Sequence, residues 1–410
     1  MKKIDILGDI ELNKMKKSGY IFLNAFLEKN LGDDLFVHII LNRYKEYRFQ
    51  IIGDISYKNI FGNNAELAWN NDDQKKELRE THILRFFHMF HLPLRYVYPK
   101  FLRYANQKKY SLSDFSICNI YAIGSGFMEN SLYDILDYFA DYLYFRKNLY
   151  LIGCNFGPYY TDGYLKKHKK LFAKAMDVCV RDKYSYNLLK EAGNVRYAPD
   201  IVFSYQLGED NSVSSKLGRY AVISVVALNK NKDNSENEEN YLCFLLQCIN
   251  YLLAKEMQIV VVGFCKNEGD DRIITQLMNR IPDHSKIKVY NYPDITYQKM
   301  MGIFKMAELV IASRYHAMII GMLYRRKIYT LSYSNKIIFV LQDIDPDIKY
   351  INIQESVNVD MQDFFDHYGY RIAEERLSEL KQLSQMHFLK LDELLFSKEH
   401  QRIINEDRTN

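Results

Sequence analysis

The chain has 410 residues, of which 48% are hydrophobic and 26% charged, with a net charge of +4. This composition excludes a chain that is disordered throughout, and so mild a charge gives no indication of nucleic-acid binding. The length exceeds what one hydrophobic core usually supports, so we expect two domains. An Asp stands where a signal peptide would be apolar, and no run of 18 apolar residues occurs, which favours a cytoplasmic protein.

Short apolar runs alternate with longer amphipathic segments, which is typical of parallel-sheet α/β domains. The predicted strands of the first half are Tyr20–Phe26, Phe49–Ile52, Ile117–Ile123, Leu149–Cys154 and Val178–Val180. A polar stretch at 206–219 predicts a linker. Beyond it the predicted strands are Tyr220–Leu228, Gln258–Phe264, Ile287–Tyr290, Leu309–Ala312 and Ile328–Ser332, with a helix over 241–257. Leucines at helical spacing predict a helical tail from about residue 361.

This order of elements predicts an α/β fold with two Rossmann-like domains that face a cleft, followed by a long C-terminal helix. The domains are expected over 1–205 and 220–345, with the linker at 206–219 and a helical extension over 346–410. In open parallel sheets, ligands bind beyond the carboxyl ends of the strands. The residues that follow each predicted strand are therefore the candidates for chemistry.

Arg314 and His316 directly follow the predicted strand Leu309–Ala312. If the backbone there is extended, residues two apart face the same side, and if a helix has begun, its free N–H groups add to an anion site. Either geometry suits a phosphate or carboxylate, because a guanidinium binds planar anions through two parallel hydrogen bonds. The alternative is an Arg paired with a carboxylate and a core His, which the absence of an adjacent acid in the sequence disfavours.

Tyr333 and Lys336 follow the next predicted strand, Ile328–Ser332. Their position at a carboxyl end makes them candidate ligands of the same cleft. Taken alone, Lys336 is better explained as a solvated lysine at the start of a helix. Both interpretations remain open from the sequence.

Two strand ends of the first half carry similar candidates. Asn155 and Gly157 follow Leu149–Cys154 in a tight loop that could bring backbone amides close to a ligand or form an ordinary turn. Arg181 ends another strand beside Asp182, and a simple pair between these neighbours is the favoured interpretation when they are considered alone.

The order of these motifs resembles the polysaccharide pyruvyltransferase family. The motifs are NFGPY at 155–159, VRDKYS at 180–185, APDIVF at 198–203, SRYHAMIIG at 313–321 and YSNK at 333–336, with NLGDD at 30–34 and AIGSGF at 122–127. The resemblance covers roughly residues 20–345. The chain departs from the family pattern at Gly124-Ser125-Gly126, where a double glycine is usual, and at Arg325-Arg326-Lys327, which replaces Gly-x-Pro.

The resemblance implies a bilobed enzyme of the glycosyltransferase-B type that moves the pyruvyl group of phosphoenolpyruvate onto a sugar of a cell-surface polysaccharide or its precursor, as a ketal. It implies a donor side in the second domain and an acceptor side in the first, with phosphoenolpyruvate as co-substrate and no cofactor. Arg314 and Arg181, with Lys336, would bind the anionic donor. His316 would deliver a proton to the methylene carbon, a role typically worth roughly 10²–10⁴-fold in rate.

On the acceptor side, Asp33 is the loop acid that could deprotonate a sugar hydroxyl, although an acid at a helix start is the favoured alternative. Asn30, in the same motif, and Ser313, beside Arg314, are candidate substrate-binding residues. The chemistry requires no metal, and the six cysteines show no ligand spacing, so buried free thiols are expected.

The stretch 81–113 contains no acid, and its Lys and Arg residues are interleaved with aromatic residues. It could lie in the headgroup region of an anionic membrane, which would suit a lipid-linked acceptor, or it could form ordinary helices with a solvated basic face.

Two other function classes compete with pyruvyl transfer. The main one is a nucleotide-sugar-dependent glycosyltransferase of the same bilobed fold, but no carboxylate pair typical of retaining enzymes occurs between Met300 and Asp345. A binding protein without catalysis is disfavoured by the three cations at strand ends, Arg314, His316 and Lys336.

Overall fold

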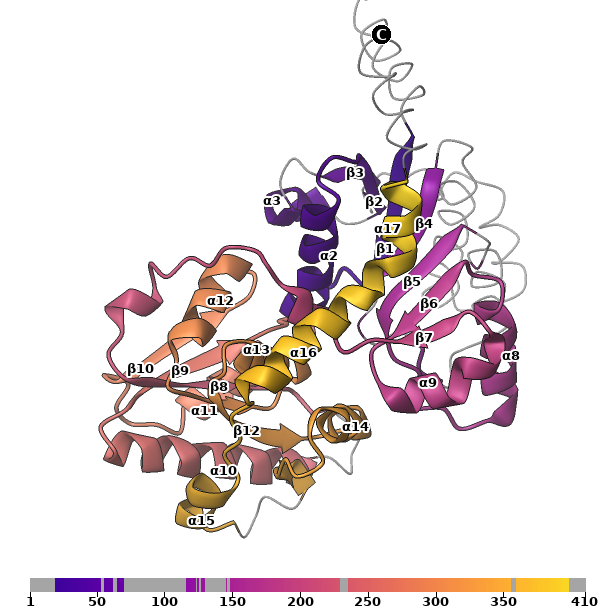
Figure 1. Ribbon diagram of the computed structural model, residues 1–410. Helices are drawn as coiled ribbons and strands as arrows, with labels where there is room; N and C mark the ends of the chain where they lie inside the picture. Colours follow the sequence, from indigo (N-terminus) through magenta and orange to yellow (C-terminus); the bar gives the residue numbers. More distant parts are fainter. Residues whose placement is uncertain are drawn as a thin grey trace, which may run out of the picture.

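The chain forms two parallel-sheet α/β domains with helices packed on the sheets, as was predicted from the alternation of apolar runs and amphipathic segments (Figure 1). The computed structural model describes residues 19–52, 55–61, 65–69, 116–122, 124, 127–129, 145, 148–228, 235–354 and 359–397. The basic stretch 81–113 lies outside the described residues. Among the helices of the described ranges, none is both long and apolar enough to cross a membrane.

The first sheet has seven parallel strands in the order β3-β2-β1-β4-β5-β6-β7. The strands are β1 Tyr20–Ala25, β2 Phe49–Ile52, β3 Ala65–Trp69, β4 Ser116–Ala122, β5 Leu149–Cys154, β6 Asp177–Val180 and β7 Val195–Tyr197. The helices are α2 Leu31–Arg43, α3 Lys58–Phe61, α8 Asp162–Phe172 and α9 Lys183–Leu189, with short 3-10 turns at η1 Ile55–Tyr57, η3 Lys190–Ala192 and η4 Ile201–Ser204. Every residue of β5 and β6 is buried, as expected for strands covered on both faces.

The second sheet has six parallel strands in the order β10-β9-β8-β11-β12-β13. The strands are β8 Tyr220–Ser224, β9 Gln258–Gly263, β10 Ile287–Asn291, β11 Leu309–Ala312, β12 Lys327–Ser332 and β13 Tyr350–Asn352. The helices are α10 Ser235–Ala254, α11 Asp270–Met278, α12 Tyr297–Met306, α13 Tyr315–Leu323, α14 Asn335–Ile344 and α15 Met361–His367, and η5 Ser214–Lys216 lies in the linker. Strand β13 differs from the sequence prediction, which assigned these residues to a helical extension.

The C-terminal segment 374–395, which we call the C-terminal strap, runs from the second domain back to the first (Figure 1). It consists of α16 Glu374–Ser384, η8 Gln385–Phe388 and α17 Leu389–Leu395. Its start is held in the second domain by an ion pair between Arg325 and Glu374 at 2.8 Å. Its end is held in the first domain, where Arg43 Nε donates to Asp392 Oδ1 at 3.1 Å. The strap therefore joins the two domains.

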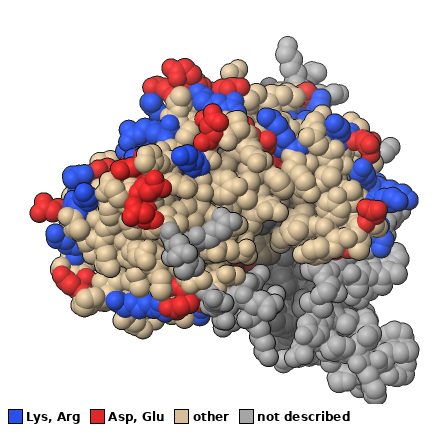
Figure 2. All heavy atoms as spheres, turned by 90° about the horizontal axis from the view of Figure 1, so that it is seen from below, with Lys and Arg blue, Asp and Glu red and all other residues tan. Residues whose placement is uncertain are grey.

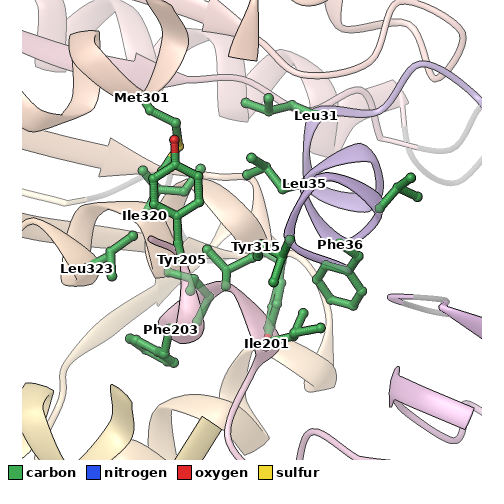
Figure 3. Close-up of a cluster of buried hydrophobic side chains, with 14 of the residues drawn as sticks. Leu31, Leu35, Phe36, Ile201, Phe203, Tyr205, Met301, Tyr315, Ile320 and Leu323 are labelled. Carbon is green, nitrogen blue, oxygen red and sulfur yellow. The ribbon is translucent and has the colours of Figure 1, made fainter. Parts of the chain in front are cut away.

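A shared hydrophobic core joins the two domains (Figure 3). Side chains of α2 and η4 from the first domain meet side chains of α12 and α13 from the second; those drawn include Leu31, Leu35, Phe36, Ile201, Phe203, Met301, Tyr315, Ile320 and Leu323. All are buried, so separating the domains would expose a large apolar area. A polar contact lies at the same interface, where the Tyr292 hydroxyl donates to Asp34 Oδ2 at 2.7 Å. This packing holds the amino-terminal end of α2 against α13.

Candidate active site

A cleft of about 820 Å³ opens between the two domains. Its lining includes Met128, Asn155, Phe156, Gly157, Pro158, Asp182 and Tyr184 from the first domain, and Val226, Ala227, Leu228, Asn267, Glu268, Arg314, Tyr333, Ser334, Asn335, Lys336 and Asn352 from the second. These segments lie at or just beyond the carboxyl ends of β4, β5, β6, β8, β9, β11, β12 and β13. The cleft thus lies where open parallel sheets bind ligands. Figure 2 shows a hollow within a largely uncharged part of the viewed face, with basic and acidic side chains interspersed around it.

Arg314 caps α13 and lies in a buried ion-pair network of its own domain. The backbone of Arg314 is extended, whereas His316 already belongs to the helix, which begins at Tyr315. The two side chains therefore contact different partners. Arg314 Nε donates to Asp270 Oδ2 at 3.0 Å, its Nη2 also bonds Asp270, and its Nη1 bonds Glu268. The alternative of an Arg paired with a carboxylate, which was disfavoured from the sequence, is therefore what the structure shows for Arg314. Both carboxylates come from the loop and helix that follow β9, more than 40 positions earlier in the sequence.

His316 lies in the first turn of α13 and contacts the first domain. Its Nε2 is 3.4 Å from Arg181 Nη1 and 3.9 Å from Asp200 Oδ2, and because a guanidinium only donates, the contact with Arg181 fits a neutral ring whose Nε2 accepts. Burial, together with the positive charges of Arg181, Lys336 and Arg314, holds the pKa of His316 well below 6.5. A Cβ on Gly32 would lie 1.8 Å from His316 Nδ1, so the close approach of α2 to this ring requires glycine.

Arg181 is the central residue of the interface between His316 and the first domain. Its Nη1 donates to Asp200 Oδ2 at 3.1 Å and its Nη2 to Asn155 Oδ1 at 3.1 Å. The neighbouring Asp182 instead caps α9 by accepting from the Ser185 amide at 2.6 Å. The pairing of Arg181 with Asp182, favoured from the sequence alone, is thus corrected to a pairing with Asp200. That residue lies in the APDIVF motif, to which the sequence assigned no chemical role.

Asp33 lies in the first turn of α2, whose cap is Asn30 rather than Asp33 itself. A Cβ on Gly124 would be 2.6 Å from Asp33 Oδ1 and 3.5 Å from both Arg181 Nη1 and His316 Cε1, so these three side chains converge beside Gly124. Burial raises the pKa of Asp33 to about 6, against the lowering effect of Arg181. We call Asp33, Arg181, Asp200 and His316 the floor cluster, since they are buried beside Asn155, which lines the cleft.

Tyr333 and Lys336 line the second-domain wall of the cleft, as predicted. Lys336 Nζ lies 5.6 Å from the centroid of the Tyr333 ring. Its charge also reaches His316, whose pKa it lowers. The description of Lys336 as a solvated lysine at a helix start is therefore incomplete, because its charge contributes to the electrostatics of the cleft.

Two predicted ligands have backbone or side-chain groups already engaged. The Gly157 amide donates to the Phe127 carbonyl at 2.7 Å, so Gly157 shapes the cleft wall instead of offering an N–H group to a ligand. Ser313 is fully buried, with its hydroxyl accepting from Tyr241 at 2.7 Å and its amide donating to Ser224 Oγ at 3.0 Å. Ser313 therefore holds the β11–α13 turn in place and does not line the cleft.

Asn30 reaches the cleft through Glu268, and its Nδ2 donates to Glu268 Oε1 at 3.1 Å. Glu268, Asp270 and Tyr184 lie at the site but were not predicted from the sequence. Each follows or lies near the end of a strand, and this position was the signal that could have identified them.

Five of the six cysteines are buried and Cys243 is exposed. Within the described ranges, no group of three His, Cys, Asp or Glu residues could hold a metal ion.

Comparison with known proteins identifies the architecture and the family. HepE from Anabaena, crystallised with UDP and glucose, superposes with a TM-score of 0.50 at 11% identity, covering 96% of this chain and all of HepE. A candidate UDP-N-acetylglucosamine 2-epimerase from Listeria monocytogenes superposes with a TM-score of 0.54 at 9% identity, covering 92% of this chain and 96% of that one. These likenesses show a glycosyltransferase-B-like fold.

Sequence comparison is more specific than the fold. No functionally curated protein matches the chain significantly. The family described as polysaccharide pyruvyl transferase, however, matches residues 30–335, a range that includes the whole floor cluster together with Asn30, Arg314 and Tyr333. The chain belongs to the polysaccharide pyruvyl transferase family.

Proposed function

We propose that this protein transfers the pyruvyl group of phosphoenolpyruvate onto a sugar of a cell-surface polysaccharide or its precursor, forming a ketal. The observation that carries the proposal is that Arg314 and Lys336 line the cleft, while Arg181 and His316 are buried near enough for all three cations to lower the pKa of His316. Phosphoenolpyruvate carries a carboxylate and a phosphate, so its site needs fixed cations placed beside a proton donor.

The donor half of the proposed reaction begins with protonation of the methylene carbon of phosphoenolpyruvate. In the free protein, His316 is neutral because it is buried among cations. A bound phosphate would offset the field of Arg181 and Lys336 and favour the imidazolium. The proton then passes to the methylene carbon, and the adjacent carbon becomes electrophilic. A sugar hydroxyl oxygen bonds to that carbon and loses its proton to the base, and phosphate leaves with the electrons of its C–O bond. A second hydroxyl then closes the ketal and gives its proton to His316, which is neutral after the first step.

Asp33 is the proposed base for the attacking hydroxyl. It lies in the floor cluster with His316 and Arg181, and its raised pKa places it close to the operating pH that suits a general base. The acceptor sugar would enter from the open cleft, past Asn155 and the aromatic ring of Tyr184. A lipid-linked acceptor and membrane contact through residues 81–113 stay predictions.

The pH profile of the reaction should report Asp33. Because Asp33 must lose its proton to act as the base, and His316 holds its proton only in the donor complex, kcat at saturating phosphoenolpyruvate should rise with pH through an inflection near pH 6. Asp33→Asn should remove this ascending limb and lower turnover. The check is phosphate release measured between pH 4.5 and 8.5, with unpyruvylated surface polysaccharide of the source organism as acceptor.

Asp34 provides a matched control for this pH profile, since it is the neighbouring buried acid on the same helix. Burial raises the pKa of Asp34 to about 8, and its carboxylate faces Tyr292 instead of the floor cluster. Asp34→Asn should therefore leave the inflection near pH 6 in place. An inflection near pH 8 that disappears in Asp34→Asn would contradict the assignment of the base to Asp33.

A nucleotide sugar is a poorer match to the cleft than phosphoenolpyruvate. The cationic residues in the described lining of the cleft are Arg314, which already carries two carboxylate partners, and Lys336. A nucleoside diphosphate would bring two phosphates to these two cations. Phosphoenolpyruvate, a smaller donor with three carbons, could also reach Arg181, so its anionic groups match the available cations better.

A thermal-shift panel tests the donor directly. At 100 times its dissociation constant a ligand stabilises the fold by about 2.7 kcal/mol, which corresponds to roughly 5 °C or more in a domain of this size. We expect this shift with phosphoenolpyruvate, and a much smaller one in Lys336→Met, which removes a charge without breaking an ion pair between described residues. A shift with UDP-sugars and none with phosphoenolpyruvate would replace the proposal by a glycosyltransferase.

A further inference from the structure

Glu268 lies in the loop between β9 and α11 and projects its carboxylate into the cleft. Its side chain is 41% exposed and lines the cavity. Even so, it is held by groups from both domains: Arg314 Nη1 from the second, and Asn30 Nδ2 from the first at 3.1 Å. Arg314, with the charge of Lys336 as a second positive group, holds the pKa of Glu268 below its ordinary value against the raising effect of burial.

Asp270, the other acid on Arg314, is placed quite differently. Its side chain is 1% exposed, and Oδ2 accepts from the amides of Phe264 at 2.9 Å and Cys265 at 3.1 Å as well as from Arg314 Nε. These bonds fix the guanidinium and leave one nitrogen, Nη1, on the side of the cleft. Asp270 therefore anchors Arg314, whereas Glu268 occupies its remaining binding position.

The partners of Glu268 are the residues expected to bind substrate. Arg314 and Lys336 were predicted from the sequence as ligands of the donor and Asn30 as a substrate-binding residue. Asn30 and Arg314 bond this carboxylate, and the charge of Lys336 acts on it. Such a set of donors, formed by an amide, a guanidinium and an ammonium, matches a planar carboxylate. These donors form a binding site for an anion. In the free protein the exposed side chain of Glu268 fills this site in place of a ligand.

We propose that Glu268 occupies the binding position of the donor's carboxylate in the free protein, and that the donor displaces it. The identity of the donor as phosphoenolpyruvate rests on the proposed function, whereas the displacement requires only a small molecule that carries a carboxylate. When the donor binds, its carboxylate takes Arg314 Nη1 and Asn30 Nδ2, and Glu268 moves into the solvent of the cleft.

The displacement predicts opposite effects for the two acids of Arg314. Glu268→Gln removes the competing charge and should tighten the binding of pyruvate and of phosphoenolpyruvate by roughly tenfold or more, the scale of one charge-assisted hydrogen bond. Asp270→Asn loosens the anchor of Arg314 and should weaken the binding of both. Calorimetric titration of the full-length chain with pyruvate, inorganic phosphate and phosphoenolpyruvate measures these affinities.

Glu308→Gln is the matched control. Glu308 forms the same type of ion pair, with Arg219 at 2.7 Å, and its side chain is also 41% exposed, but it does not line the cleft. Its substitution should leave every affinity unchanged. Glu268→Ala is the second variant, and it should show the same gain as Glu268→Gln if the carboxylate alone is responsible.

The titrations test the displacement of Glu268 and the identity of the donor separately. Unchanged or weaker pyruvate binding in Glu268→Gln and Glu268→Ala would overturn the displacement and make Glu268 a residue that positions Arg314. A gain for inorganic phosphate alone would also overturn it, since the position would then not be that of a carboxylate. A gain for pyruvate without any preference of the wild type for phosphoenolpyruvate over pyruvate would support the displacement and refute the proposed donor.

Discussion

His316→Gln is expected to lower turnover by roughly 10²–10⁴-fold, the usual contribution of a general acid, while the fold stays intact. The glutamine keeps a side-chain oxygen that can accept from Arg181, as His316 Nε2 does at 3.4 Å, and it has nearly the same length. What it cannot do is deliver a proton to the methylene carbon. Phosphate release at saturating phosphoenolpyruvate, with unpyruvylated surface polysaccharide as acceptor, measures the loss.

His168→Gln is the control for this substitution. His168 is a second buried histidine, on α8, where its Nδ1 contacts the Tyr164 carbonyl at 2.9 Å within the first-domain core. Its replacement should change stability but not the turnover of the folded protein. If His316→Gln kept more than about a tenth of wild-type turnover, His316 would not be the acid.

Arg181→Met is expected to lower the free energy of unfolding by about 3–5 kcal/mol, because it leaves a buried carboxylate without its ion-pair partner. The Asp200 side chain is completely buried and retains hydrogen bonds from the Tyr315 hydroxyl at 3.1 Å and the Val202 amide at 2.9 Å, with His316 Nε2 at 3.9 Å. The methionine preserves much of the volume of the arginine, so the loss reports the charge and not a cavity. Denaturant unfolding of the two proteins measures the difference.

The double variant Arg181→Met/Asp200→Asn separates the stabilising role of Arg181 from its chemical role. The asparagine can still accept from Tyr315 and Val202 but carries no charge, so most of the lost stability should return. Turnover should stay low, because no guanidinium remains beside His316. Recovery of both properties would mean that Arg181 serves the fold alone.

The central strands of both sheets could be predicted from the sequence, whereas three edge strands could not. β5 and β11 are buried along their whole length, and their uninterrupted apolar runs gave the signal. β3, β7 and β13 lie at the edges of their sheets, and β7 and β13 have three residues each. An edge strand needs partners on one side only, so its sequence can be short and mixed in polarity.

The position of the candidate site could be predicted from the sequence, but not the pairing of its charges. Arg181, Arg314 and His316 follow strand ends, and parallel strands bring such residues to one edge. Their partners Asp200, Asp270 and Glu268 lie elsewhere in the sequence, and only the folded sheets bring them close. The engaged amide of Gly157 and the buried hydroxyl of Ser313 depend in the same way on tertiary contacts.

The C-terminal strap makes the first domain discontinuous along the chain. Asp392 lies 349 positions after Arg43 in the chain, so the ribosome releases the complete second domain before the first can acquire its last helices. A chimera that replaces the second domain has to keep residues 374–395 with the first, because these helices complete its surface.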